Sequence, residues 1–366
     1  MNRTSVSFVA VATFLGTALA LPAQSGQSAP PRELRELGRA MEQVGKIVEK
    51  SVEKSIDQAL RAVEHSVRHL DRELEREFGR PSGQQGARRQ GQQSATSIDT
   101  TVAFPRDGVV DLSSMSGDIV LTGWDRSEAR IRASSERGQL QWRVTATRIT
   151  IESEGYRGRS DETRYELTVP RGVRVVMRSQ SGDLSARGTR GPVDAHSSSG
   201  DIEVVDAADR IELGSLSGDI TASQLRGEVD VTSLNGIIEL ADIEGRSVDV
   251  ESTSSDIVLA NVRSRDVSAS TVNGEVEYRG TIEAGGQYEF HSHSGTITLT
   301  IPANASARFG IETFSGELDS DFPVTLQPDR SGRQGRRLEF VLGNGGATVI
   351  AETFSGDVEI RRDTRR

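Results

Sequence analysis

The residues of this chain that could do chemistry are mainly carboxylates, and they recur at a regular interval. In most copies of a short repeated phrase an acid directly follows a glycine, and carboxylate oxygens are the ligands that Ca²⁺ prefers. The sequence contains neither the Gly-Gly-x-Gly-x-Asp calcium repeat nor an EF-hand loop. We therefore favour acids that cap solvated turns, and expect no metal or other cofactor. A weak cation-binding stripe is the alternative, and its candidates are Asp183, Asp201, Asp219 and Asp256.

The histidines provide no complete metal or nucleophile site. His65 and His69 are four residues apart, and His291 and His293 share one face of an expected strand, but neither pair has a third ligand. We find no Ser-His-Asp arrangement, phosphate loop or zinc spacing in the sequence. We therefore predict no catalytic residues and no enzyme activity. A carbohydrate-active enzyme that uses clustered carboxylates is the less favoured alternative.

A sequence repeat must position these residues. Ten copies carry an aliphatic pair, a Ser/Thr, a Ser/Asn, a Gly (once Ser255), usually an acid, and another aliphatic residue. Neighbouring copies are mostly 18–21 residues apart, and two longer gaps of 65 and 40 residues are close to three and two units. Self-similarity at this period is typical of solenoids, in which each unit buries its apolar side against its neighbours. The marked glycines are Gly117, Gly182, Gly200, Gly218, Gly236, Gly274, Gly295, Gly316 and Gly356.

The columns of the aligned repeat predict two strands around a corner. Positions seven and five residues before the glycine, and two after it, are apolar, and this period of two indicates strands with one buried face. The buried parity changes at the glycine, so the chain must bend there. The Ser/Thr three residues before the glycine and the Ser/Asn one before it are expected inside the coil or at the corner, where only small side chains fit. The predicted fold class is all-β, a parallel β-solenoid (β-helix) of about 10–13 coils with 18–21 residues each, preceded by one long α-helix.

The domain boundaries follow from shifts in composition. Residues 1–23, with Arg3 before an apolar stretch and small residues, predict a signal peptide, with an uncleaved anchor as the alternative. Residues 31–79 place apolar residues at helical spacing between prolines and a glycine, which predicts a long amphipathic helix. Its narrow apolar stripe favours a coiled coil between subunits, with docking on its own solenoid or a membrane surface as alternatives. Residues 80–97 are a flexible linker and residues 98–362 the β-solenoid, in which residues 124–171 lose the glycine as a capping end coil would.

Composition limits the location and the partners. The chain has no cysteine, a net charge of −10 and 4% aromatic residues. The absence of cysteine excludes disulfides and suits an exported bacterial protein that folds without redox help. An acidic, aromatic-poor chain disfavours nucleic acid as a partner. We expect an exported protein (periplasmic, cell-surface or extracellular) with no transmembrane span in the mature chain.

Two segments carry a resemblance to a known family. The segment LTVPRGVRVVMRSQSGD, from Leu167 to Asp183, and a second copy that begins at Leu299 and leads to Glu317, resemble a bacterial putative-adhesin family, domain of unknown function 4097. The resemblance covers roughly residues 100–360. It implies an exported or envelope-associated β-solenoid of a family often linked to cell-envelope stress systems, without established catalytic residues.

These observations lead to one preferred function and two alternatives. The preferred one is a non-catalytic exported solenoid that binds a protein or glycan surface at the cell envelope and forms a homo-oligomer through residues 31–79. The first alternative is an envelope-stress sensor or scaffold that binds a membrane protein or a cationic peptide. The second is the carbohydrate-active β-helix enzyme.

Overall fold

The computed structural model describes residues 93–154, 162–323 and 336–364. Strands are the only regular secondary structure in these residues, in agreement with the expected all-β class. Within these ranges there is also no helix with the length and apolarity needed to cross a membrane. The predicted signal peptide (1–23) and helix (31–79) lie outside the described residues, as does most of the predicted linker (80–97). The first strand begins at Gln93, so the sheet starts a few residues before the boundary expected at residue 98.

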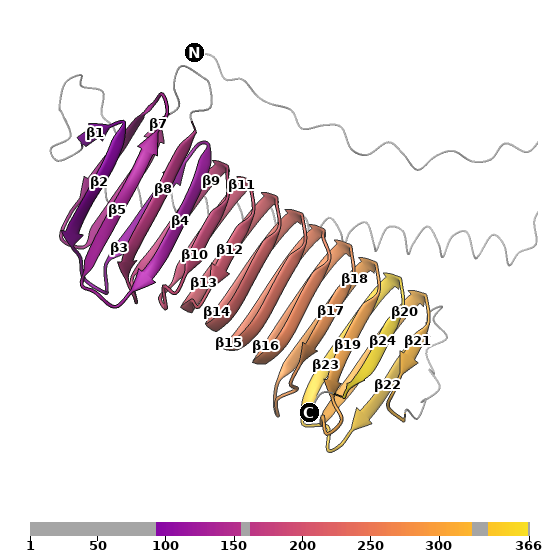
Figure 1. Ribbon diagram of the computed structural model, residues 1–366. Helices are drawn as coiled ribbons and strands as arrows, with labels where there is room; N and C mark the ends of the chain where they lie inside the picture. Colours follow the sequence, from indigo (N-terminus) through magenta and orange to yellow (C-terminus); the bar gives the residue numbers. More distant parts are fainter. Residues whose placement is uncertain (1–92, 155–161, 324–335, 365–366) are drawn as a thin grey trace, which may run out of the picture. The chain divides into compact units, whose positions relative to one another are not determined.

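Each coil consists of a strand, a corner at the marked glycine, and a second strand. In the coil of Gly200, β11 (Val193–Ser199) precedes the corner and β12 (Ile202–Val205) follows it. The strands before the corners pair with one another and form what we call the first sheet, and the strands after the corners form the second sheet (Figure 1). In the middle of the stack the second strand of one coil continues into the first strand of the next. These continuous strands are β14 (Ile220–Asn235), β15 (Ile238–Ser254) and β16 (Ile257–Asn273). β13 (Ala208–Ser217), the first strand of the coil of Gly218, begins separately after β12.

Neighbouring coils pair in parallel, with the repeat columns in register. Val193 of β11 lies between Val175 and Ile211 of the adjacent first-sheet strands, and Ile202 of β12 is paired with Ile220. The aliphatic columns thereby become continuous rows, and their side chains belong to one buried core cluster. With strands about 4.8 Å apart, each coil covers the apolar side of the next. The predicted solenoid stacking is confirmed in these parallel pairings.

At the N-terminal end the order of the coils in space differs from their order in the sequence. The coil of Gly117, β3–β4, lies directly on β9–β10, and β7–β8 covers its other side although it comes later in the chain. Antiparallel strands then end the stack, with β5 and β2 in the second sheet and β6 and β1 in the first. The 65-residue gap therefore contains one extra coil and antiparallel end strands, where three repeat units were expected. The bounds are β1 (Gln93–Ala95), β2 (Ser97–Ala103), β3 (Val109–Ser114), β4 (Gly117–Trp124), β5 (Glu128–Ser135), β6 (Gln139–Val144), β7 (Arg148–Glu154), β8 (Thr163–Pro170), β9 (Arg174–Ser181) and β10 (Leu184–Arg187).

The C-terminal end uses the same device. The coil of Gly356, β23–β24, is inserted between the coil of Gly295, β18–β19, and the coil of Gly316, β20–β21. The antiparallel β22 then closes the first sheet beside β20. With β7–β8, the ten marked coils make eleven within the described residues, inside the expected range of about 10–13. The bounds are β17 (Val276–Gly280), β18 (Gln287–Ser294), β19 (Ile297–Pro302), β20 (Ala307–Ser315), β21 (Leu318–Ser320), β22 (Arg336–Leu342), β23 (Ala347–Ser355) and β24 (Val358–Asp363).

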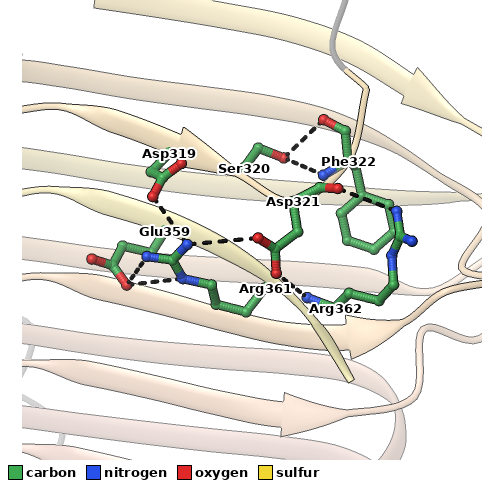
Figure 2. Close-up of polar contacts among 7 residues, drawn as sticks. All are labelled: Asp319, Ser320, Asp321, Phe322, Glu359, Arg361 and Arg362. Carbon is green, nitrogen blue, oxygen red and sulfur yellow. Dashed lines mark hydrogen bonds and ion pairs between the residues drawn. The ribbon is translucent and has the colours of Figure 1, made fainter. Parts of the chain in front are cut away.

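An arginine pair joins the inserted coil to the end coil (Figure 2). The Arg361 guanidinium lies 3.0 Å from Asp319 of β21 and donates to Glu359 of its own strand at 3.0 Å. The backbone N–H of Arg362 donates to the Asp321 carboxylate at 3.0 Å, which continues the pairing beyond the short β21. Because these groups are at the surface, their ion pairs contribute little to stability. Their main effect is to fix the register between the coil of Gly356 and the coil of Gly316.

A second corner closes each coil after the second strand. Six residues after the marked glycine, several coils have a residue in the left-handed region, with φ between 55° and 66°. Gly, Asp and Asn tolerate this conformation better than other residues do, and they dominate the column. The sequence analysis did not predict this corner, although the residue types of the column could have indicated it. Its members are Gly188, Asp206, Gln224, Asp242 and Asn261.

Candidate binding surface

The glycine corner is required by a close approach between coils. At Gly182, φ is 135°, and an added Cβ would lie 2.3 Å from the carbonyl oxygen of Gly117 in the adjacent coil. Gly316 and Gly356 do not have a positive φ, yet a Cβ there would lie 2.0 and 2.1 Å from the neighbouring carbonyl oxygen. The predicted need for unusual backbone angles is therefore confirmed at most corners, but the close approach was not predicted. It leaves no room for a side chain at the nine glycine corners, whereas the tenth corner carries Ser255. The corners with a positive φ are Gly117, Gly182, Gly200, Gly218, Gly236, Gly274 and Gly295.

The two hydroxyl columns before the corner separate into an inner and an outer row. The Ser/Thr three residues before the glycine is almost always buried, as predicted, and in the C-terminal coils it binds the corner of the adjacent coil. Ser292 donates to the carbonyl of Gly274 at 3.1 Å, and Thr313 donates to that of Gly356 at 3.0 Å. The Ser/Asn one residue before the glycine was expected inside the coil or at the corner. It lies at the corner and is exposed or half-buried, because the strand has already turned outward. This outer row is Ser116, Ser181, Ser199, Ser217, Asn235, Ser254, Asn273, Ser294, Ser315 and Ser355.

The acids directly after the glycine form a ladder with the backbone, which we call the corner aspartate row. Asp183 Oδ1 accepts the backbone N–H of Asp201 at 3.0 Å, and Asp219 Oδ1 accepts that of Ile237 at 2.8 Å. Asp256 makes the same bond to the next coil at 2.8 Å. Among the described residues, no three or more His, Cys, Asp or Glu side chains are grouped as a metal site requires. The bonds from the backbone of the next coil support the interpretation of these aspartates as turn caps.

The described histidines lie in surface rows with other partners. His291 Nδ1 is 3.6 Å from a carboxylate oxygen of Glu352, and the His293 ring stacks on Phe354 with the ring centroids 5.0 Å apart. His196 Nε2 lies 3.2 Å from Asp194 Oδ1. His65 and His69 lie outside the described residues.

Large apolar side chains project outward from the first sheet, two residues before the corner. Leu216 and Leu234 lie on adjacent strands and are 51% and 45% exposed, and Met115 and Phe314 occupy the same column in other coils. Exposed apolar side chains that are contiguous, as these two leucines are, mark interaction sites more often than scattered ones do. We call Leu216 and Leu234 the leucine row. The sequence analysis missed it, although apolar residues at the outward parity of a strand are a detectable signal.

A row of acids crosses the same outward face. Asp194, Glu212, Asp230 and Asp249 are direct register partners on four adjacent strands, which places neighbouring carboxylates about 4.8 Å apart at the backbone. We call this set the sheet acid row. Asp194 is paired with His196, and Glu212 with an arginine at 3.5 Å. In the described part of the chain, neither Asp230 nor Asp249 has an ion-pair or hydrogen-bond partner. Like charges directly opposite each other on adjacent strands are destabilising, so Asp230 and Asp249 do not stabilise the sheet.

The pKa values differ between the acids of this face that have an ion-pair partner and those that have none. Partial shielding from water raises the pKa of Asp230, and the charges of Asp249 and Glu212 raise it further, against smaller opposing effects of Arg210 and His196. Shielding also raises the pKa of Glu251, which lies two residues after Asp249 on β15, and the charges of Asp249 and Asp230 raise it further. Shielding acts on Asp194 in the same direction, but the hydrogen bond and charge of His196 outweigh it, and the pKa of Asp194 is lowered. Asp230 and Glu251 are thus carboxylates that would be stabilised by a cationic group.

The comparisons with known proteins identify the family. The model of the family described as Toastrack DUF4097 matches residues 152–361, more than half of the chain. The chain therefore belongs to this family, as the resemblance indicated. Comparison with curated proteins gives no match.

Two solved structures resemble the chain at low identity. One is a "putative cell adhesion protein" from Clostridium sporogenes ATCC 15579, with 8% identity over 73% of this chain and 100% of the other, at a TM-score of 0.23. The other is a "putative lipid binding protein" from Parabacteroides distasonis ATCC 8503, with 11% identity over 75% of this chain and 98% of the other, also at 0.23. These TM-scores are too low for either likeness to inform the fold or the function.

Proposed function

We propose that this protein is a non-catalytic, exported binding protein of the bacterial cell envelope, which contacts a protein or glycan surface through the outward face of its first sheet. The leucine row is the main support for this proposal. Its two adjacent leucines are about half exposed on a regular sheet, and a partner that covers them would remove their apolar surface from water. The glycines, hydroxyls and acids of the corner hold neighbouring coils in register and thereby position the strands of the first sheet. Membership of the Toastrack family is consistent with a binding role.

A binding assay on isolated cell envelopes tests the proposal. The full chain should sediment with envelopes from the producing bacterium, and the Leu216→Ser/Leu234→Ser variant should bind about tenfold more weakly, since interface cores depend on buried apolar anchors. Val120→Ser is the matched control, because Val120 is 40% exposed but lies on the second sheet. Equal binding by the double variant and the wild-type chain would contradict the proposal.

The proposal includes oligomerisation through residues 31–79, which lie outside the described residues. A coiled coil there would present several copies of the binding face to one surface and increase avidity. Light scattering on the mature chain with and without residues 31–80 tests this part. We expect an oligomer and a monomer respectively, and two monomers would refute the coiled coil.

A further inference from the structure

We infer that the outward face of the first sheet over β13–β15 docks a polypeptide segment with one apolar and one basic edge, lying along the stack. The inference rests on the proposed function and specifies the partner of the same face. Two observations lead to it: the exposed leucine row, and the acids parallel to it that have no ion pair or hydrogen bond among the described residues.

The two rows are separated by one column of residues. Leu234 and Asp230 lie four positions apart on β14, which is about 13 Å along a strand. The column between them holds Gly214 and Thr232, which are register partners and half-buried, and on β15 the exposed Glu251, which is the partner of Thr232. The spacing of the rows matches a helix of about 10 Å diameter or an extended segment with its side chains. A ligand along this column would contact leucines on one side and carboxylates on the other, with the Glu251 carboxylate on β15.

A histidine lies over the glycine of this column. A Cβ on Gly214 would lie 2.4 Å from His196 Nδ1, so the imidazole occupies the space that a side chain there would fill. His196 is in turn held by Asp194 at 3.2 Å. Arg178 lies 3.9 Å from Asp194 on the other side. Asp194 therefore has partners within this chain, whereas the members of the sheet acid row on β14 and β15 have none among the described residues, so a basic ligand should lie over β13–β15.

Charge decides which partner fits this face. Arg210 is shared between Glu212 and Glu228, at 3.5 and 3.9 Å, and it offsets part of their negative charge. Asp230, Asp249 and Glu251 remain without an ion-pair partner among the described residues. Anionic lipid headgroups, nucleic acids and acidic glycans would be repelled by these carboxylates. Lysine or arginine side chains would be attracted, while the apolar edge of the same segment covers the leucines.

The test uses the full chain and a defined probe. The probe is a fluorescent synthetic peptide of about 18 residues with Leu and Lys at helical spacing, roughly 27 Å long when helical. A matched peptide with Glu in place of every Lys is the control probe. We expect binding of the Lys peptide, measured by fluorescence anisotropy, that weakens when salt is raised from about 50 mM to about 500 mM, and no binding of the Glu peptide.

Three variants locate the binding on this face. Asp230→Asn/Asp249→Asn should weaken binding of the Lys peptide about tenfold, and so should Leu216→Ser/Leu234→Ser. Asp183→Asn/Asp201→Asn removes two charges from the corner aspartate row while leaving an amide oxygen as acceptor, and should bind as the wild-type chain does. Melting temperatures of all variants exclude unfolding as the cause of a loss.

The possible outcomes separate this inference from the proposed function. Equal binding of the Lys and Glu peptides, or undiminished binding by Asp230→Asn/Asp249→Asn, overturns the inference. If the wild-type chain binds envelopes through the leucine row but does not bind the Lys peptide, the inference fails and the proposed function stands. If the chain binds neither envelopes nor peptide, both fail.

Discussion

Two rows of acids run along this solenoid, and they differ in what surrounds them. In the corner aspartate row, one carboxylate oxygen of each aspartate accepts a backbone N–H of an adjacent coil, at 2.8–3.2 Å. In the sheet acid row, Asp230 and Asp249 face each other on adjacent strands and accept no such bond within the described residues. The first row stabilises the fold in which it lies. The second is tolerated by the fold, which makes it the better candidate for function.

The comparison shows why periodic acids alone do not indicate a site. Both rows repeat at the coil period and both are at the surface, so their spacing cannot distinguish them. The difference is the presence of a backbone donor within reach, because a carboxylate that accepts an N–H has a structural role that explains it. Substitutions at the corner glycine, in the corner aspartate row and in the sheet acid row test this difference.

The largest effect is expected at the corner glycine. Gly182→Ala places a Cβ 2.3 Å from the carbonyl oxygen of Gly117 at a φ of 135°, and should lower the free energy of unfolding by about 3 kcal/mol. Gly310→Ala is the control, since nothing lies within 4 Å of a Cβ there, and it should change stability by less than about 1 kcal/mol. Urea unfolding of both variants measures the difference. Similar losses in the two would refute the close-approach argument.

A smaller effect is expected in the corner aspartate row. Asp219→Ala removes the acceptor of the Ile237 N–H and should destabilise the chain by about 1 kcal/mol. Asp219→Asn retains an amide oxygen in the same place and should lose less. Thermal unfolding of the pair distinguishes a hydrogen-bonding role from a role of charge. If Asn were as harmful as Ala, the charge of the row would matter more than its bond.

The sheet acid row should respond in the opposite direction. Asp230→Asn removes a like charge that has no partner and should stabilise the chain at neutral pH by about 0.5 kcal/mol. The same substitution therefore destabilises slightly in one row and stabilises in the other. A loss of stability for Asp230→Asn would show that its carboxylate has a structural partner after all.

The stabilisation by Asp230→Asn should depend on pH. Because the pKa of Asp230 is raised in the folded protein, the folded state binds its proton more readily than the unfolded state does. The penalty of its charge is then complete above the raised pKa and declines as the pH falls through it. The variant's advantage in melting temperature should be present at pH about 7 and absent near the usual pKa of 3.8. An advantage that grows as the pH falls would contradict the direction of the shift.

The smallest effect is expected in the leucine row. Leu216→Ser alone should change the free energy of unfolding by less than about 0.5 kcal/mol, because the side chain is half exposed and adds little to the core. Leu213→Ser, which alters a buried leucine on the same strand, should instead cost about 3 kcal/mol. Thermal unfolding compares them. A large loss for Leu216→Ser would make the leucine row structural and would remove the main support for a binding face.

Much of the fold could be predicted because the same pattern of apolar, hydroxyl and glycine positions recurs in every coil. Alternating apolar columns predicted the buried rows, the marked glycine predicted the corner, and the serine three residues before it was correctly expected inside. The outer Ser/Asn row was expected inside the coil or at the corner, because the parity of the strand alone does not show where the strand turns outward. The second corner lies six residues after the marked glycine, beyond the columns that carry the apolar pattern, and was missed although all its left-handed residues except Gln224 are Gly, Asp or Asn.

The binding face could be recognised only in part. The corner aspartates were noticed because they follow the glycine, whereas Asp230 and Asp249 looked like ordinary outward residues of a strand. Only their register, with Asp249 directly beside Asp230, shows that they are neighbours. The expected helix lies outside the described residues, so its role stays a prediction.

From its sequence alone, this chain is a stack of coils, because hydrophobic burial at a fixed period requires each unit to cover the next. The tertiary structure decided which coils are neighbours. The coil of Gly356 lies between those of Gly295 and Gly316, and β7–β8 lies outside the coil of Gly117, since equivalent coils present the same edge and many orders satisfy the same pattern. It also decided which acids have a partner, because a hydrogen bond depends on a distance between coils that the spacing along the chain does not contain.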